Sequence, residues 1–577
     1  MDGITGGSAT VGQVSSTGLY TAGTAAGLHS VVATSVANSG QKAAAAAAVT
    51  DLAGVYTYHN NLARDGSNIH EYALTPSTVT AAHFGKVATC TVDGAIYTQP
   101  LWVANLPVQG AKHNVVFVAT QHDGLFAFDA DAGPCKGLWS VSLIDAAHGG
   151  TSGETTIPDG LVGDSTGDIQ PEIGVTGTPV IDPARSILYV VTKSVNSGQT
   201  TFFQRLHAID LTTGNEKPGS PVTLAGTYAG SGDGGASVAF DPRQEHQRAG
   251  LALINNLIYI AWGAHEDKAP WYGWMMAYQY SGSAFSQRWI LNVSPNTKEA
   301  GIWMSGGAPA ADSSSNIYVI TGNGNFDANS PGAPNNDYGD TLLQLSPSLT
   351  VTQWFTPSDQ LTDSQNDKDF GSGGAAILAD LPAGNSVTHA LICGGKNGSV
   401  YVLNRDLLGG FGDQVAVQKI TFGSLIFATS AFWNNGLYLG GVKAALQSYH
   451  LNSTTVQFSL ASSSSHVYGF PGASPSISAS SPIANGIVWS IDSSQYCTLQ
   501  SKGCGPAVLY AHDATNVGTE LWDSAQASGD AAGLAVKFTV PTVANGRVYV
   551  GTRGNNTGGA DNSSSTPGEL DIYGLKP

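Results

Sequence analysis

The fold is indicated most clearly by residues 97–120, YTQPLWVANLPVQGAKHNVVFVAT, together with GLFAFDADAG from Gly124 and LWSVSL from Leu138. Apolar and polar residues alternate in short runs, and turns rich in Gly, Asn and Asp separate the runs. This period-2 pattern with such turns is typical of antiparallel β-hairpins. The stretch therefore predicts four consecutive antiparallel strands.

The same pattern returns along the rest of the chain. Further units of two strands begin at Gly177, Arg248, Gly306, Gly371, Ala428, Ser474 and Phe538. Several of them continue into a third strand that ends in Asp and Gly, a turn signal, and then into a short fourth strand. Four strands repeated eight times predict an all-β, eight-bladed β-propeller. Sandwich domains in series are the alternative, but they would not explain why the same strand order and turn chemistry recur.

The first 50 residues have a different composition. They are rich in Gly, Ala, Ser and Thr, with alternation in TVGQVSSTGLYTAG and HSVVATSVA. This stretch resembles the C-terminal half of a bacterial immunoglobulin-like domain, either as an incomplete sandwich or as a loosely held arm. We therefore expect a partial immunoglobulin-like β segment over 1–50 and a propeller over 55–577.

Composition narrows the class of protein. Only 11% of the residues are charged, against about 25% in soluble domains, and the net charge is −18. A nucleic-acid binder would need a basic face, so nucleic acid is not expected as a partner. The sequence has no apolar run long enough to span a membrane, and its first residues do not read as a signal peptide. A closed ring leaves only short, protected sheet edges, which predicts a monomer.

The five cysteines allow two disulfides. Cys497 and Cys504 bracket a short loop that suits a hairpin disulfide, and Cys90 and Cys135 flank one repeat and could close it. Cys393 lies in an apolar strand and is expected to be a buried free thiol. All five could instead be reduced. We favour two disulfides and a secreted or periplasmic protein, because the chain has little Lys and much Ser, Thr, Asn and Gly.

Propeller geometry predicts where polar side chains gather. The start of the first strand and the end of the second strand lie at the same end of each blade, so these positions converge around the channel. In a chain so poor in charge, they carry many charged and amide groups, which indicates a site on one face. The alternative is that they only satisfy hydrogen bonds in a wet channel. The candidates at or beside these positions are His122, Asp123, Arg248, His265, Glu266, Asp267, Trp271, Trp303, Asn323, Asp369 and Lys396.

Three short segments resemble a known repeat. AFDADAGPCKGLW from Ala127 and YAHDATNVGTELW from Tyr510 are similar to the tryptophan-docking repeat of pyrroloquinoline-quinone alcohol dehydrogenases, and HAIDLTTG from His207 is a partial copy. Members of that family are eight-bladed propellers. The resemblance implies that a Trp ties each blade to its neighbour.

A stretch of about 100 residues resembles the cofactor region of the same family. GIWMSGGAPAADSSSNIYVITGNGNFD from Gly301 is similar to the blade whose Trp floors the quinone and whose Asn binds calcium. WFTPSDQLTDSQNDKDFGSGGAAILAD, from Trp354, is similar to the connection that carries the catalytic Asp, and KNGSVYVLNRD, from Lys396, to the segment that contacts the quinone.

The resemblance implies roles for individual residues. Trp303 would lie under the quinone ring, Lys396 would bond the quinone oxygens, and Asp369 would be the general base. Asn323 and Asp369 would bind calcium, with Glu266 or Asp267 as a further ligand. Calcium takes such oxygen ligands. We also expect Arg248 to bind the cofactor, and His122, Asp123 and Trp271 to bind substrate. The chain departs from the family pattern because it has no Cys-Cys dipeptide, and because His265 and Trp271 have no counterpart.

Three functions remain open on the sequence. The first is an exported oxidoreductase that oxidises an alcohol or sugar with pyrroloquinoline quinone and calcium in the central funnel. The second is a noncatalytic scaffold that binds protein or glycan. The third is a hydrolase or lyase acting on carbohydrate, with His122 or His265 as base and Asp123, Asp267 or Asp369 as its partner, because the fold alone does not decide the chemistry.

Overall fold

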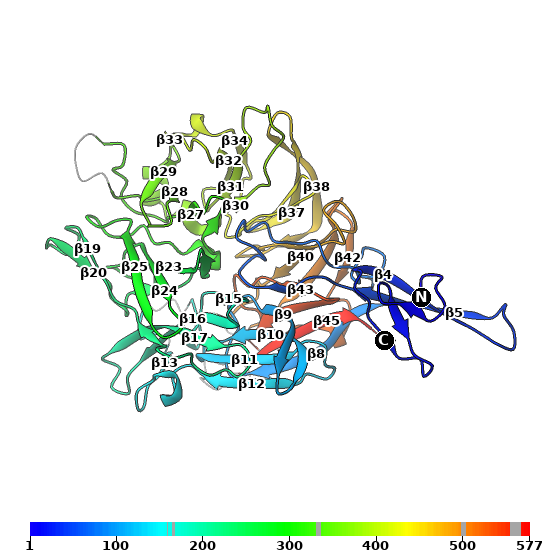
Figure 1. Cartoon of the computed structure of the whole chain (residues 1–577). Coiled ribbons are helices and arrows are strands. Elements are labelled where there is room, and N and C mark those ends of the chain that lie inside the picture. The colour runs from blue at the N-terminus through cyan, green and yellow to red at the C-terminus, as the bar shows by residue number, and fades with distance from the viewer. Residues whose placement is uncertain (159, 164–167, 331–335, 498–503, 554–566, 577) are drawn as a thin grey trace.

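The computed structural model describes residues 1–577 except 159, 164–167, 331–335, 498–503, 554–566 and 577. Eight antiparallel sheets follow one another around a closed ring, and the colours of Figure 1 run round it from cyan through green, yellow and orange to red. The predicted eight-bladed β-propeller is therefore confirmed. Within each blade the strands pair largely in chain order.

The first four blades contain the following strands. Blade 1 has β9 (Leu101–Val108), β10 (Ala111–Ala119), β11 (Gly124–Asp129) and β12 (Gly137–Ser142), with β6 (Gly54–Val55) beside β9. Blade 2 has β13 (Thr155–Pro158), β14 (Glu172–Ile173), β15 (Val180–Asp182), β16 (Ile187–Val195), β17 (Phe202–Asp210) and β18 (Val222–Thr223). Blade 3 has β21 (Glu245–His246), β22 (Ala252–Ile254), β23 (Leu257–Ala264), β24 (Trp274–Tyr280) and β25 (Phe285–Asn292). Blade 4 has β26 (Ala310–Ala311), β27 (Ile317–Ile320), β28 (Leu342–Leu345), β29 (Val351–Thr356) and β33 (Gly410–Phe411).

The remaining blades complete the ring. Blade 5 has β30 (Ala376–Ile377), β31 (Ala390–Gly394), β32 (Ser399–Asn404) and β34 (Gln418–Thr421). Blade 6 has β35 (Ala431–Trp433), β36 (Gly436–Gly440), β37 (Ala444–Asn452) and β38 (Gln457–Tyr468). Blade 7 has β39 (Ser476–Ser478), β40 (Ile487–Asp492), β41 (Val508–Asp513) and β42 (Glu520–Asp523), with β7 (Ser67–Asn68) parallel to β39. Blade 8 has β43 (Thr542–Ala544), β44 (Arg547–Thr552), β45 (Gly568–Leu575) and β8 (Phe84–Val92).

Short elements lie between or beside the blades. They are the hairpin β19 (Thr227–Ala229) with β20 (Ser237–Ala239), the helix α1 (Gln360–Gln365), and the 3-10 turns η1 (Ala146–His148), η2 (Met304–Gly306), η3 (Phe370–Ser372), η4 (Asp413–Val415) and η5 (Ser528–Asp530).

Hydrophobic cores fill the spaces between neighbouring blades. Blades 1 and 2, for example, share a core that includes Leu101, Phe117 and Ile209. The ring of Trp139 lies against Gly214 of the next blade, and its indole N–H donates to the Leu211 carbonyl at 3.0 Å. Gly214 has a φ of 77°, and a Cβ there would come within 2.7 Å of that ring, so glycine is required. The Trp that ties one blade to the next is thus found at this seam.

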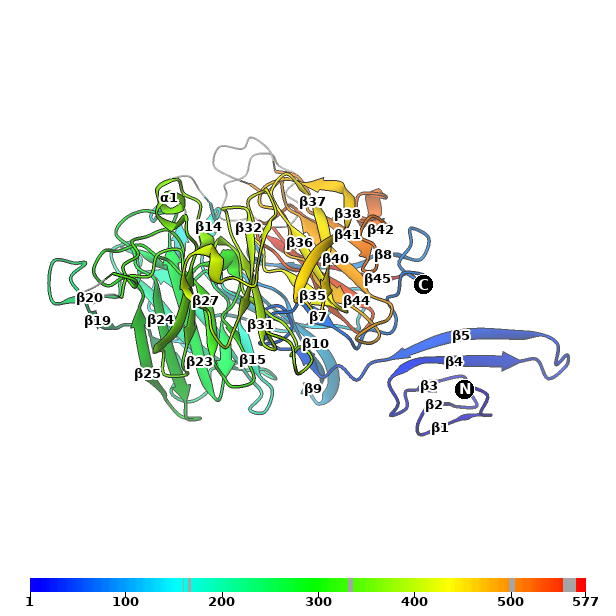
Figure 2. The same ribbon diagram turned by 90° about the horizontal axis from the view of Figure 1, so that it is seen from above.

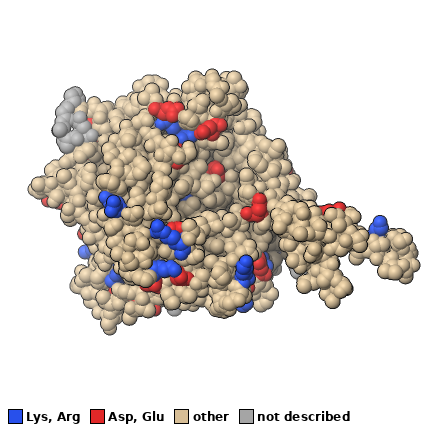
Figure 3. Space-filling model, viewed as in Figure 1, with Lys and Arg blue, Asp and Glu red and all other residues tan. Residues whose placement is uncertain are grey.

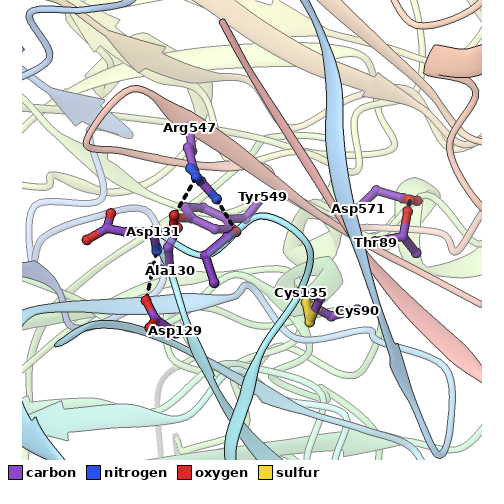
Figure 4. Close-up of a disulfide and its surroundings, with 10 residues drawn as sticks. Thr89, Cys90, Asp129, Ala130, Asp131, Cys135, Arg547, Tyr549 and Asp571 are labelled. Atoms are coloured by element: carbon purple, nitrogen blue, oxygen red, sulfur yellow. Dashed lines mark hydrogen bonds between the residues drawn. A yellow bond between two sulfur atoms is a disulfide. The ribbon is translucent and has the colours of Figure 1, made fainter. Parts of the chain in front are cut away.

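The ring closes where the start of the propeller meets its end. β8 pairs with β45 from Phe84↔Leu575 to Val92↔Gly568, so a strand near the beginning of the chain completes the last blade. The Cys90–Cys135 disulfide, predicted from the sequence, joins β8 to the turn after β11 (Figure 4). It therefore links blade 8 to blade 1, whereas the sequence had suggested that it closes a single repeat. Beside it, Arg547 donates to the carbonyl of Asp131 at 2.9 Å.

A segment ahead of the first blade runs round the inside of the ring. Successive residues of 54–68 hydrogen-bond to every blade in turn, and in Figure 1 blue chain crosses the middle of the ring. The bonded partners, in blade order, are Val103, Ile181, Leu251, Ala311, Ile377, Phe432, Ile477 and Val543. Each partner lies on or beside the first strand of its blade, so this segment occupies the channel.

The N-terminal residues lie outside the ring. β1 (Gly7–Ser8), β2 (Gly12–Val14) and β3 (Tyr20–Thr21) form one small sheet, and β4 (Gly27–Thr34) pairs with β5 (Lys42–Val49) in a hairpin. Figure 2 shows this hairpin extending away from the propeller. The immunoglobulin-like character of the segment stays a prediction.

The other sequence expectations on cysteines and charge can be compared with the structure. Cys497 and Cys504 form the second disulfide, and Cys393 is a buried free thiol, as predicted. Figure 3 shows that Lys, Arg, Asp and Glu are sparse on the face it displays. Within the described residues, no helix is long and apolar enough to cross a membrane.

Candidate functional site

A cavity of about 410 Å³ opens among the loops at one end of the ring. Its volume is in the range of pockets that hold a small organic ligand, roughly 300–1,000 Å³. The lining brings together most of the residues predicted from the sequence, from blades far apart in the chain. They are Arg248, His265, Glu266, Asp267, Trp271, Trp303, Asn323, Asp369 and Lys396.

The blade repeat positions these residues. Arg248 lies ahead of β22 and Trp303 ahead of β26, at the beginnings of first strands. Asn323 follows β27 and Lys396 follows β31, at the ends of second strands. These are the two positions that propeller geometry brings to a common mouth, so the convergence inferred from the sequence is present in the fold.

An ion-pair network forms one end of the cavity, which we call the Asp369 end. Lys396 Nζ lies 2.5 Å from Asp369 Oδ2 and 2.8 Å from Asp367 Oδ1. Burial lowers the pKa of Lys396, but the carboxylates of Asp369 and Asp367 outweigh burial and raise it above its ordinary value. The lysine is therefore a fixed cation between two carboxylates.

Asn323 is held in place by the same two aspartates, Asp367 and Asp369. Its backbone N–H donates to Asp369 Oδ1 at 2.8 Å, and its side-chain amide donates to Asp367 Oδ1 at 2.9 Å. Its Oδ1 atom is buried and has no hydrogen-bond partner among the residues that the structure describes. A buried amide oxygen without a partner is costly, so it indicates a missing ligand such as a cation or a donor group.

A glycine allows these groups to approach Trp303. A Cβ on Gly322 would lie 2.3 Å from Asp369 Oδ1 and 3.2 Å from Trp303 Nε1. Any side chain at Gly322 would therefore displace the carboxylate or the indole. Lys396 Nζ lies 5.5 Å from the Trp303 ring centroid, within cation–π range.

Aromatic rings surround Trp303. Phe427 and Phe538 meet it edge-on, with ring centroids 6.1 and 6.2 Å away. The two phenylalanines stack on each other at 5.8 Å, and Phe470 closes on Phe427 at 5.1 Å. The cavity thus has an apolar, aromatic wall next to its charged groups.

The opposite end, which we call the Arg248 end, is rich in cations. The Arg248 guanidinium carbon lies over the rings of Tyr97 and Phe538, 5.2 and 4.8 Å from their centroids. Burial lowers the pKa of Arg248 to about 10, although Tyr97 and Asp168 act in the opposite direction. Lys537, also buried, pairs with Asp168 at 2.7 Å.

Two histidines and a buried lysine lie beside Arg248. His265 stacks at 4.2 Å against His246, and its Nε2 lies 2.6 Å from Lys193 Nζ. Lys193 also donates to the carbonyls of Glu245 and Arg243. Burial lowers the pKa of Lys193 to about 7, and burial keeps both histidines neutral by lowering their pKa values well below the ordinary value.

The remaining predicted residues differ in their surroundings. Glu266 accepts a hydrogen bond from the Asp168 N–H, and Trp271 is buried in the cavity wall. Burial raises the pKa of Asp267 to about 6, helped by the negative charge of Asp369. In the described part of the chain, no three His, Cys, Asp or Glu side chains are arranged to hold a metal ion.

His122 and Asp123 do not line this cavity. His122 Nδ1 lies 2.9 Å from Glu172, and this pairing raises the pKa of the imidazole. Asp123 is buried, and burial raises its pKa well above the ordinary value. A substrate-binding role for these two residues stays a prediction without support from the cavity.

Four residues of the cavity lining have unusual backbone geometry. Phe538 has a φ of 68°, and Glu266, Asp267 and Asp367 also have positive φ. Such conformations cost about 1–3 kcal/mol each in non-glycine residues and persist where the surroundings enforce them, often at functional sites.

Sequence reasoning missed part of the lining. Lys537, Phe538 and Phe427 lie just ahead of first strands, in the same position as Trp303, so the blade rule could have found them. His246 lies two residues before Arg248, and Asp367 two before Asp369. No motif marked these residues, because their role depends on neighbours from other blades.

Comparison with known proteins finds similarity at the level of the fold. No protein-family model matches the sequence, and no curated protein matches it either. The structure resembles a quinohemoprotein alcohol dehydrogenase of Comamonas testosteroni, with a TM-score of 0.57 and 14% identity over 90% of this chain and 80% of that one. It also resembles a quinohemoprotein alcohol dehydrogenase of Pseudomonas putida HK5, with a TM-score of 0.55 and 12% identity over 91% and 80%. A europium-containing methanol dehydrogenase has a TM-score of 0.54 and 12% identity over 91% and 98%. The chain therefore has the propeller fold of quinoprotein dehydrogenases.

Proposed function

We propose that this protein is an exported quinone-dependent oxidoreductase that oxidises an alcohol or a sugar in the cavity. The observation that carries the proposal is the convergence of Trp303, Asn323, Asp369 and Lys396 on one cavity. They come from four separate positions in two blades, and they are the residues to which the family resemblance assigns a role.

The residues present fit the implied cofactors. The unpartnered Oδ1 of Asn323 and the carboxylate of Asp369 are oxygen ligands of the kind that calcium takes. The Trp303 ring offers a platform for a flat cofactor, and Lys396 offers a cation for its oxygens. When bound, the quinone supplies a two-electron acceptor and calcium polarises its carbonyl.

Asp369 is arranged to act as a base. The Lys396 ammonium and the Asn323 N–H hold its two oxygens in fixed positions, at 2.5 and 2.8 Å. A carboxylate fixed in this way can accept the proton of a substrate hydroxyl, because each oxygen keeps a further lone pair. Lys396 would orient this carboxylate and offset its charge before the proton arrives.

Two features are this chain's own. The family's vicinal disulfide is absent, and Phe427 and Phe538 supply the aromatic wall beside Trp303. Export is supported by the two disulfides, because such bonds persist in oxidising compartments.

The test is reconstitution of the purified protein with pyrroloquinoline quinone and calcium. We expect a bound chromophore, a Tm raised by a few degrees because the ligand binds only the folded state, and dye reduction with an alcohol or sugar. D369N should abolish dye reduction and leave quinone binding within a few-fold.

The matched control is D312N at the turn between β26 and β27, which also removes one carboxylate from a buried ion pair, here with Arg405. It should keep full dye reduction for the protein that remains folded. Failure to bind quinone in the presence of calcium, or full activity in D369N, would overturn the proposal. The two other hypotheses, a noncatalytic scaffold and a hydrolase or lyase, would then remain.

A further inference from the structure

We propose that the Arg248 end of the cavity is a subsite for a carboxylate on the substrate, so that the substrates are hydroxy acids such as sugar acids. The inference deepens the proposed function and rests on it for the reaction, but binding at this subsite needs no quinone. Its test is therefore separate from the test of oxidation.

Arg248 is a buried cation with its donors unused. The residue is 6% exposed and lines the cavity, yet its guanidinium makes no hydrogen bond or salt bridge to any described residue. A guanidinium carries five N–H donors in a planar fork that matches a carboxylate. These donors reach the cavity, where a carboxylate on a ligand would pair with them.

The other cations that line the cavity already have a carboxylate. Lys396 pairs with Asp367 and Asp369, and Lys537 pairs with Asp168 at 2.7 Å. Asp168 also acts on Arg248 through space, but its ion pair is with Lys537. Arg248 is thus the cation for which the described lining provides no counter-ion, and one anionic group on a ligand would complete the set.

His246 supports an oxygen-rich ligand at the same place. It precedes Arg248 by two residues, lines the cavity, and is 4% exposed. Both of its ring nitrogens are buried and lack a partner within the described residues. A neutral imidazole has one donor and one acceptor, so His246 can bond a carboxylate oxygen and a neighbouring hydroxyl of a hydroxy acid.

The geometry assigns this carboxylate to the substrate and not to the quinone. Phe538 contacts Trp303 on one side, at 6.2 Å, and Arg248 on the other, at 4.8 Å. Lys396 lies over the Trp303 ring, whereas Arg248 lies over Phe538 and Tyr97, so the cation next to a flat cofactor on Trp303 is Lys396. The Arg248 end can therefore hold the acidic group of a second molecule.

The experiment is calorimetric titration of the protein without quinone. Three pairs are compared, each a carboxylate and a neutral counterpart: galacturonate and galactose, gluconate and glucitol, lactate and propane-1,2-diol. We expect at least one carboxylate to bind about tenfold or more tightly than its counterpart, and R248Q to remove that preference. R288Q, at an exposed arginine of β25, is the matched control and should leave it unchanged.

Several results would overturn the inference. One is equal binding of acid and neutral counterpart in all three pairs. Another is a preference for the acid that survives in R248Q. A third is a quinone-loaded protein that no longer binds the acid and whose quinone affinity falls about tenfold in R248Q, because the subsite would then belong to the cofactor. If quinone does not bind but the acid preference depends on Arg248, the subsite stands and only the oxidation proposal fails.

Discussion

Arg64 and Arg248 are both buried arginines in the middle of the ring, but they lie in different regions. Arg64 belongs to the segment 54–68 that occupies the channel, and it is 0% exposed. Its guanidinium donates to the carbonyls of Pro309, Tyr58 and Asn61 and to the Thr57 hydroxyl, at 2.7–3.0 Å. Arg248 lies at the cavity, and its guanidinium donates to none of the described residues.

The two regions differ in the hydrogen-bond acceptors that they provide for a cation. In the channel, one arginine donates to the Pro309 carbonyl next to β26 and to groups of the segment 54–68 itself. At the cavity, the cation is carried by the blade loops, and the described residues supply no acceptor to its guanidinium. Burial alone therefore does not distinguish a structural arginine from a ligand-binding one, whereas the hydrogen-bond acceptors around each guanidinium do.

The largest expected effect is at Arg64. R64M should lower the free energy of unfolding by about 3–5 kcal/mol, because it leaves several buried carbonyls without a donor. Thermal unfolding and urea titration measure the loss. R64K keeps the charge and fewer donors, so it should fall between wild type and R64M.

The control for Arg64 is Arg185, which also donates to a carbonyl, that of Tyr280, but is partly exposed. R185M should cost less than about 1 kcal/mol. Equal losses of unfolding free energy in R64M and R185M would contradict the distinction between the two regions, because the channel contacts would then stabilise the protein no more than a surface contact does.

Lys193 is an intermediate case and gives a pH-dependent prediction. It donates to two carbonyls and to His265, and burial lowers its pKa to about 7 from 10.5. Between these two pH values the unfolded chain binds more protons than the folded protein, so folding becomes more favourable as pH rises. From pH 7 to 9 the gain is about 2 kcal/mol, and K193M should lack it.

The measurement is the Tm of wild type and K193M at pH 7 and pH 9. The difference between the two proteins should shift in favour of wild type at pH 9. K217M, which removes a surface lysine paired with Asp210, is the control and should track wild type at both pH values. A K193M difference that does not change with pH would show that Lys193 stays charged when buried.

The blades were predictable from the sequence because each is coded locally. Alternating residues such as those of 101–119 and turn signals such as Asn-Gly at 545–546 act within one hairpin. The closing strand β8 and the channel segment 54–68 were not found, because their partners lie at the other end of the chain or in all eight blades.

The blade rule and the family resemblance together predicted the part of the site that stands next to strand ends. Trp303 and Asp369 precede first strands, and Asn323 and Lys396 follow second strands. All four lie within about 100 residues, so position and resemblance agree on them. The pairing of Lys537 with Asp168 and the contact of Lys193 with His265 join residues that are far apart in sequence. No local pattern encodes these contacts, since they arise only when the ring closes.

The smallest expected effect has the opposite sign and concerns Arg248. In the ligand-free protein, R248M should leave the free energy of unfolding unchanged or raise it by up to about 1 kcal/mol. The substitution removes a buried cation that has no acceptor in the described part of the chain, and it adds an apolar side chain next to Phe538 and Tyr97. Thermal unfolding of wild type, R248M and R64M under one condition gives the contrast directly. A clear loss of stability in R248M would mean that the fold does use this guanidinium, and the distinction between the two regions would fail. A gain would show that the protein keeps a destabilising residue at the cavity, as expected where binding and stability make opposing demands.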